Sequence, residues 1–173
     1  MMTEFQNSGP PSCSQPPIFN VPYWARTLLW PFVALSVMGV ALSLWVHIGA
    51  VMGEKVAPST LFVQLHVGCF VVFVPVFILS RRRTDRQKFW KTVLRGSPGL
   101  RYMVYIFTAY GVVNFLNFLL FMSHTPVKAM HGDPPVEVWR GFSGHWMAFY
   151  SAALAVLLTA AQGRSDSQTQ PPP

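Results

Sequence analysis

The residues of this chain best suited to ligand or proton chemistry are its histidines. The imidazole ring is the commonest metal ligand in proteins, it holds haem iron, and it titrates near neutral pH. Four of the five histidines lie inside or at the ends of long apolar segments, and the fifth, His131, lies in a connection between two of them. The four are His47, His66, His124 and His145.

These four histidines support three chemical interpretations and one structural one. His47, His66, His124 and His145 could form a cofactor site for one haem b. His47, His66, Cys69 and His145 could form a metal site, in which the soft sulfur donor favours copper. Histidines could also transfer protons. In the structural interpretation, each imidazole only hydrogen-bonds a polar group of a neighbouring helix. The spacing contains no His-x-x-x-His pair, so these interpretations stay open.

The segments that must position the histidines are long enough to cross a membrane. A membrane-spanning helix needs about 20 mostly apolar residues. Four segments qualify, at about 24–52, 60–79, 100–122 and 142–161. Charged residues make up only 11% of the chain, against about 25% in soluble domains. We therefore expect an all-α protein, an integral membrane four-helix bundle over residues 23–161.

The two ends of the chain have a different composition. Residues 1–22 and 162–173 are rich in proline, serine and glutamine, which is typical of disordered tails. Lysine and arginine counts predict the orientation, because cytoplasmic loops carry the excess of positive charge. Eight of the 13 basic residues lie between Arg81 and Arg101. This places that loop and both termini in the cytoplasm.

The basic loop also predicts a partner. Clusters of lysine and arginine next to a membrane attract anionic lipid head groups. The expected contacts are Arg81, Arg82, Arg83, Arg86, Lys88, Lys91 and Arg95. Because the net charge of +7 is concentrated in this one loop, it indicates a membrane surface and no nucleic acid.

Helical periodicity predicts which side of each segment faces the other helices. Residues three, four or seven apart share a face, and small or polar faces pack inward in lipid. In segment 24–52 the stripe is Ser36, Gly39, Ser43 and His47. In segment 100–122 and just beyond, it is Tyr110, Asn114, Asn117 and His124. In segment 142–161, preceded by Gly141, it is His145, Ala148, Ala152, Ala155 and Thr159. We expect His145 to point inward, toward other histidines in the outer half of the bundle.

Tryptophans near the segment ends are expected to lie in interfacial aromatic belts. They are Trp24, Trp30, Trp45, Trp139 and Trp146. Nucleotide-binding, serine-hydrolase and zinc-protease motifs are absent from the sequence, and no acidic residue falls within a span. These absences argue against common enzymes and against a carboxylate-based proton relay.

Three motifs carry a family resemblance. They are Arg-Gly-Phe-Ser-Gly-His-Trp-Met-Ala-Phe-Tyr-Ser-Ala at 140–152, Leu-His-Val-Gly at 65–68 and Arg-Tyr-Met-Val-Tyr at 101–105. The chain resembles small four-span bacterial inner-membrane proteins of unassigned function. That resemblance implies a bacterial inner (plasma) membrane location and no active site. In size and helix number the chain is also similar to cytochromes of the b561 type, but it lacks their paired histidines at two depths.

Together these features predict a non-enzymatic membrane protein with a histidine-lined pocket, which binds a transition metal or one haem. Two alternatives remain. The chain could be a structural or interaction subunit of a membrane complex or a homo-oligomer, with histidines that only pack. It could also be a small haem-dependent membrane oxidoreductase.

Overall fold

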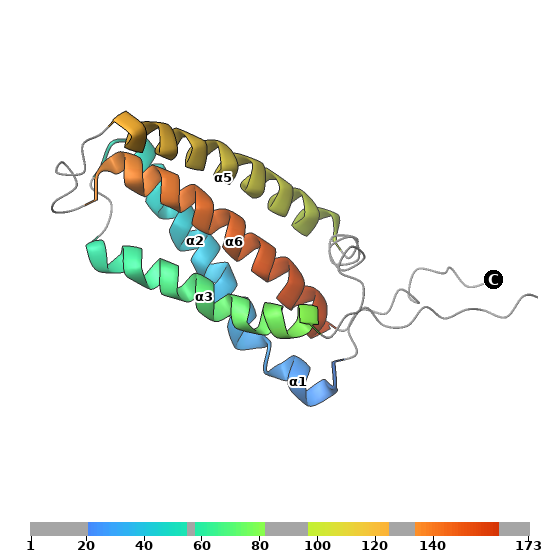
Figure 1. Cartoon of the computed structure of the whole chain (residues 1–173). Coiled ribbons are helices and arrows are strands. Elements are labelled where there is room, and N and C mark those ends of the chain that lie inside the picture. The colour runs from blue at the N-terminus through green and yellow to red at the C-terminus, as the bar shows by residue number, and fades with distance from the viewer. Residues whose placement is uncertain (1–20, 55–57, 82–96, 125–133, 163–173) are drawn as a thin grey trace, which may run out of the picture.

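The computed structural model describes residues 21–54, 58–81, 97–124 and 134–162. In these residues all regular structure is helical (Figure 1). The helices are α1 (Tyr23–Thr27), α2 (Trp30–Val51), α3 (Ser59–Arg81), α5 (Pro98–His124) and α6 (Val136–Gln162). The predictions for residues 1–20 and 163–173 of the tails, for the loop at 82–95 and for His131 lie outside the described residues. Gln162, predicted to belong to the C-terminal tail, is instead the last residue of α6.

Four helical segments are long and apolar enough to cross a membrane: 23–51, 59–81, 98–124 and 136–162. The predicted all-helical class with four spans is therefore confirmed for the part of the chain described. Three spans extend past the predicted boundaries, and the last begins six residues earlier than predicted. Helices can project beyond the apolar layer, so hydropathy underestimates their length.

The first span is not one continuous helix. It breaks between α1 and α2, at Leu28 and Leu29. Pro31 stands in the first turn of α2, where its missing N–H has no helical partner to lose. A continuous helix would bring the Pro31 ring against the carbonyl of Thr27. The proline therefore starts a new helix.

Gly53 ends α2 by adopting a left-handed conformation, with φ of 76°. Two hydrogen bonds close the end. The Glu54 N–H donates to the carbonyl of Gly49 at 3.0 Å, and the Gly53 N–H donates to that of Ala50 at 3.4 Å. This is a Schellman motif, which a residue without a Cβ adopts at little cost.

Helix α6 is the centre of the bundle. It buries 16 of its 27 residues, whereas α5 buries 3 of 27. It packs along α5 and α2 over long stretches and along α3 over a shorter one. Figure 1 shows α6 between α5 and α3, with α2 behind it. Small residues on α6 allow this close packing on several sides.

Two tryptophans that we expected at the membrane surface lie inside the bundle instead. Trp139 is 7% and Trp146 0% exposed. Both rings contact Phe62 of α3 edge-on, at centroid distances of 5.3 and 5.0 Å. The remaining three are exposed: Trp24, Trp30 and Trp45. The expectation used only the position of each tryptophan near the end of a segment. Whether the side chain is buried depends on which face of the helix it occupies.

Tyr150 joins three helices at their closest approach. Its ring lies against Gly39 of α2, and its hydroxyl lies over Gly68 of α3. The hydroxyl donates a hydrogen bond to the carbonyl of Leu65 at 2.8 Å. A side chain at either glycine would occupy the space that Tyr150 fills.

Candidate functional site

His47 lies at a contact of three helices, which we call the His47 junction (His47, Tyr110 and Ser143). It is 4% exposed. Its Nδ1 atom is 2.8 Å from the Ser143 Oγ of α6, and its Nε2 atom is 2.7 Å from the Tyr110 hydroxyl of α5. The predicted inward stripe of α2, with Ser36, Gly39, Ser43 and His47, is buried throughout.

The hydrogen bonds of the junction indicate the tautomer of a neutral His47. Ser143 Oγ donates to the carbonyl of Arg140 at 3.1 Å, so it accepts the hydrogen of His47 Nδ1. A neutral imidazole then has its lone pair on Nε2, which accepts the Tyr110 hydroxyl hydrogen. Both ring nitrogens of His47 are therefore used within the bundle.

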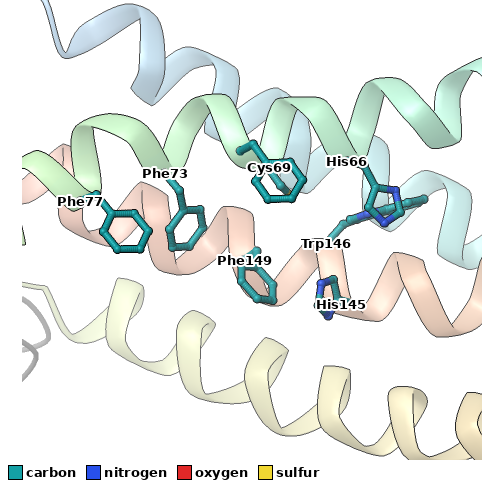
Figure 2. Close-up of a pocket in the computed structure, with 8 residues that line it drawn as sticks. His66, Cys69, Phe73, Phe77, His145, Trp146 and Phe149 are labelled. Carbon is teal, nitrogen blue, oxygen red and sulfur yellow. The ribbon is translucent and has the colours of Figure 1, made fainter.

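A second feature is an aromatic cavity of about 240 Å³ on the front of α6 (Figure 2). Helix α3 contributes one wall and α6 the other. We use the name aromatic cavity for the space lined by His66, Cys69, Phe70, Phe73, Phe77, His145, Trp146 and Phe149. Within the described residues, α3 and α5 do not pack along each other, and the cavity lies on the side of α6 between them.

The aromatic cavity has a polar end and an apolar end. Figure 2 shows His66 and His145 at one end, and Phe73 and Phe77 toward the other. His66 and Phe77 are 11 residues apart on α3, about 16 Å along the helix axis. The Phe77 side chain is 65% exposed, so the apolar end opens toward the surroundings of the bundle, which are lipid for a membrane-spanning helix.

The His66 ring is held by its own helix. Its Nδ1 atom is 3.0 Å from the carbonyl oxygen of Phe62. A carbonyl can only accept, so Nδ1 carries the hydrogen, and neutral His66 keeps a lone pair on Nε2. The ring also lies edge-on to Trp146, with centroids 5.0 Å apart. His66 therefore presents a hydrogen-bond acceptor whose orientation is fixed by two contacts.

His145 is held by rings alone. Its ring contacts that of Phe149 at a centroid distance of 4.3 Å, with planes tilted by 40°, and lies 6.0 Å from the ring of Phe115 of α5. The structure shows no hydrogen bond from His145 to another described residue. Trp146 Nε1 is buried, and it too has no hydrogen-bond partner among the residues described. The polar end thus contains polar groups that the fold leaves unused.

The predicted metal ligands divide into two places. Ser143 and His145 are two residues apart on α6, which turns them about 200° from each other. His47, which contacts Ser143, therefore lies across α6 from His145. His66 and His145 share the aromatic cavity, and Cys69 lies in its wall beside the hydroxyl of Tyr150. Among the described residues no three His, Cys, Asp or Glu side chains form a group that could hold a metal.

His124, the fourth residue of the predicted cofactor site, is the last residue of α5 and is exposed. Asn117 of the same predicted stripe is also exposed, whereas Asn114 is buried against Gly144. Phe118, four residues after Asn114, packs against Gly141 and Phe142 of α6. The contact face of α5 therefore continues through Phe118 and leaves Asn117 outside it. The sequence-predicted histidine layer is reduced to His66 and His145 at one cavity.

Several residues of both sites were missed by the sequence analysis. Ser143 was not singled out, although it stands two residues before His145. A clearer signal exists on α3, where four side chains at spacings of four, three and four share one face. They are His66, Phe70, Phe73 and Phe77. This aromatic stripe leading away from a histidine marks the α3 wall of the cavity.

Known proteins provide no further guide to these sites. No protein-family profile, curated protein or solved structure matches this chain. The proposed function is therefore argued from the contacts of the His47 junction and of the aromatic cavity.

Proposed function

We propose that this protein is a multi-pass protein of a bacterial inner membrane that binds a small, membrane-dissolved ligand in the aromatic cavity. The observation that carries this proposal is the fixed His66 ring, which lines a space bordered by phenylalanines and has an acceptor with no partner among the described residues. Binding pockets are mostly apolar, with a few well-placed polar groups. Polar side chains within a span are expensive and mark functional sites.

The position of the cavity suits a ligand that arrives through lipid. Phe70 and Phe77 are 75% and 65% exposed at its rim, and both belong to membrane-spanning α3. With both termini in the cytoplasm, His66 and His145 lie in the outer half of the bilayer. The basic loop then faces the cytoplasmic leaflet, where Arg81 and its neighbours attract anionic head groups.

A second candidate function is binding of one haem or a copper ion between His66 and His145. Metal-bound histidines usually donate their other ring N–H to a carbonyl or carboxylate, as His66 does to Phe62. His47 would not take part, because both of its nitrogens are already bonded. With haem, the protein would be a small membrane oxidoreductase.

The His47 junction supports a packing role for that one histidine. Each of its bonds joins α2 to another helix, as expected of interhelical polar contacts in membranes. A subunit of a membrane complex, or a homo-oligomer, would need only this role. That alternative predicts that the aromatic cavity holds no specific ligand.

One purification distinguishes these functions. The full chain is extracted in mild detergent, and its absorption spectrum, its metal content and the small molecules extracted by organic solvent are measured. We expect a colourless protein with a co-purifying lipid-soluble molecule that is lost from a Phe149→Ala, Phe73→Ala variant. A Soret band, or copper near one per chain, would support the second candidate. Absence of both, with an extract identical to that of the cavity variant, would leave the packing role.

A further inference from the structure

We propose that the aromatic cavity selects ligands that carry a hydroxyl group on a planar aromatic ring, as phenols and quinols do. This inference rests on the proposed function and specifies its ligand class. It starts from His66, whose Nδ1 hydrogen is taken by the carbonyl of Phe62. The remaining Nε2 lone pair needs a hydrogen-bond donor, and the hydrocarbon interior of a membrane supplies none.

The walls of the cavity suit a flat ring. Phe73 and Phe149 contact each other in its wall, with centroids 5.4 Å apart and planes at 60°. Phe149 also contacts the His145 ring, with planes tilted by 40°. Aromatic rings prefer such offset and edge-on neighbours. A cavity of about 150 Å³ is enough for benzene, so about 240 Å³ has room for one substituted ring.

The length of the cavity indicates how the ligand is oriented. Its ring hydroxyl lies at the His66 end, and an apolar tail follows the aromatic stripe toward Phe77 and leaves into lipid. The Trp146 indole, 0% exposed and without a partner for Nε1 among the described residues, lines the same polar end. Its ring stands edge-on to His66, with centroids 5.0 Å apart, and closes this end of the cavity.

A matched pair of probes tests this inference. Para-octylphenol and para-octylanisole have the same ring and tail, but the anisole has a methyl ether in place of the hydroxyl. Both are added in equal amounts to the full chain in one detergent, and native mass spectrometry gives the ratio of the two complexes. One neutral hydrogen bond contributes about 1 kcal/mol, so the phenol complex should be favoured about fivefold.

Two variants separate the hydrogen bond from unequal partitioning into the micelle. His66→Phe retains an aromatic ring but removes the acceptor, and should abolish the preference while both probes still bind. His124→Phe removes a histidine at the exposed end of α5 and should keep the preference. Each ratio is read on folded protein, checked by circular dichroism.

The outcomes separate this inference from the proposed function. If both probes bind equally well to the wild-type protein, the hydroxyl selection is wrong and an apolar ligand site remains. If neither probe binds, the proposed function is wrong as well. If the folded His66→Phe variant still prefers the phenol, another group selects the hydroxyl and the role assigned to His66 is wrong. The ratio of the two complexes on the wild-type protein can refute the inference by itself. The test therefore remains valid even if the His66→Phe variant fails to fold.

Discussion

The Nδ1 atom of His47 lies 2.8 Å from the Oγ atom of Ser143, and this contact joins α2 to the central helix. Tyr110 completes the junction from α5 at 2.7 Å. One imidazole thereby links three helices, with the hydroxyl of Ser143 directed to the carbonyl of Arg140. Such a side chain stabilises the bundle because every polar atom in it has a partner away from water.

Removing one bond of the junction should have a small, measurable cost. Interhelical hydrogen bonds in membranes contribute about 0.6 kcal/mol on average and up to about 1.7 kcal/mol. We expect Tyr110→Phe to lower the free energy of unfolding by roughly 0.5–1.5 kcal/mol, measured by reversible unfolding in mixed micelles. Tyr105→Phe is the matched control, since that exposed tyrosine of α5 should change stability little. Equal effects of the two would contradict the assigned bond.

Helices α5 and α6 should separate if Gly111 gains a side chain. A Cβ at this position would lie 2.7 Å from the carbonyl oxygen of Gly144 and 3.3 Å from the Ala148 Cβ. Backbone cannot move aside as a side chain does, and overpacking typically costs about 1–3 kcal/mol. We expect Gly111→Ala to destabilise the protein by that amount in the same unfolding assay.

Gly99→Ala is the control for Gly111, because a Cβ there would meet only the Ser97 Oγ, at 4.0 Å. It should be neutral or stabilise α5, since alanine favours the helix by up to about 1 kcal/mol over glycine. A Gly111→Ala variant as stable as Gly99→Ala would show that the two helices do not pack this closely.

Tyr150 predicts opposite behaviour for two glycines. At Gly68 an added Cβ would overlap only the Tyr150 hydroxyl, and the nearest ring carbon, Cζ, lies at an ordinary 3.4 Å. At Gly39 it would overlap the ring carbons themselves. We therefore expect Tyr150→Phe to rescue Gly68→Ala but not Gly39→Ala.

A double-mutant cycle on unfolding free energies measures this difference. The coupling between Gly68→Ala and Tyr150→Phe should be about 0.5–3 kcal/mol, the range for residues in direct contact. The coupling between Gly39→Ala and Tyr150→Phe should be much smaller. The reverse order of the two couplings would place the hydroxyl of Tyr150 elsewhere.

Both ends of α5 can test the predicted orientation. Ser97 precedes the helix and Ser123 lies one residue before its end. In a Cys13→Ser background, single Ser97→Cys and Ser123→Cys variants are exposed to a membrane-impermeant maleimide in intact cells. Because the basic loop is predicted to be cytoplasmic, only the cysteine at 123 should be labelled. If only the cysteine at position 97 is labelled, the orientation of the protein in the membrane is the opposite of the one predicted.

The sequence by itself determined the helices of this protein and much of what they bury. Apolar length fixes membrane-spanning helices, since backbone groups in lipid must bond within their own segment. The small stripe of α2 correctly predicted the burial of His47. His66 and Cys69, three residues apart on α3 and both among the predicted metal ligands, line the same cavity.

Only the tertiary structure decided which histidines lie together. The spacing of residues along the sequence gives the face of the helix on which each residue lies. It does not tell which neighbouring helix packs against that face. His47 and His145 therefore looked alike in sequence, yet they lie on opposite sides of α6. The central position of α6 is the physical reason, because a helix surrounded on several sides buries two different faces. One face bonds His47 through Ser143, and the other joins His145 to His66 at the aromatic cavity.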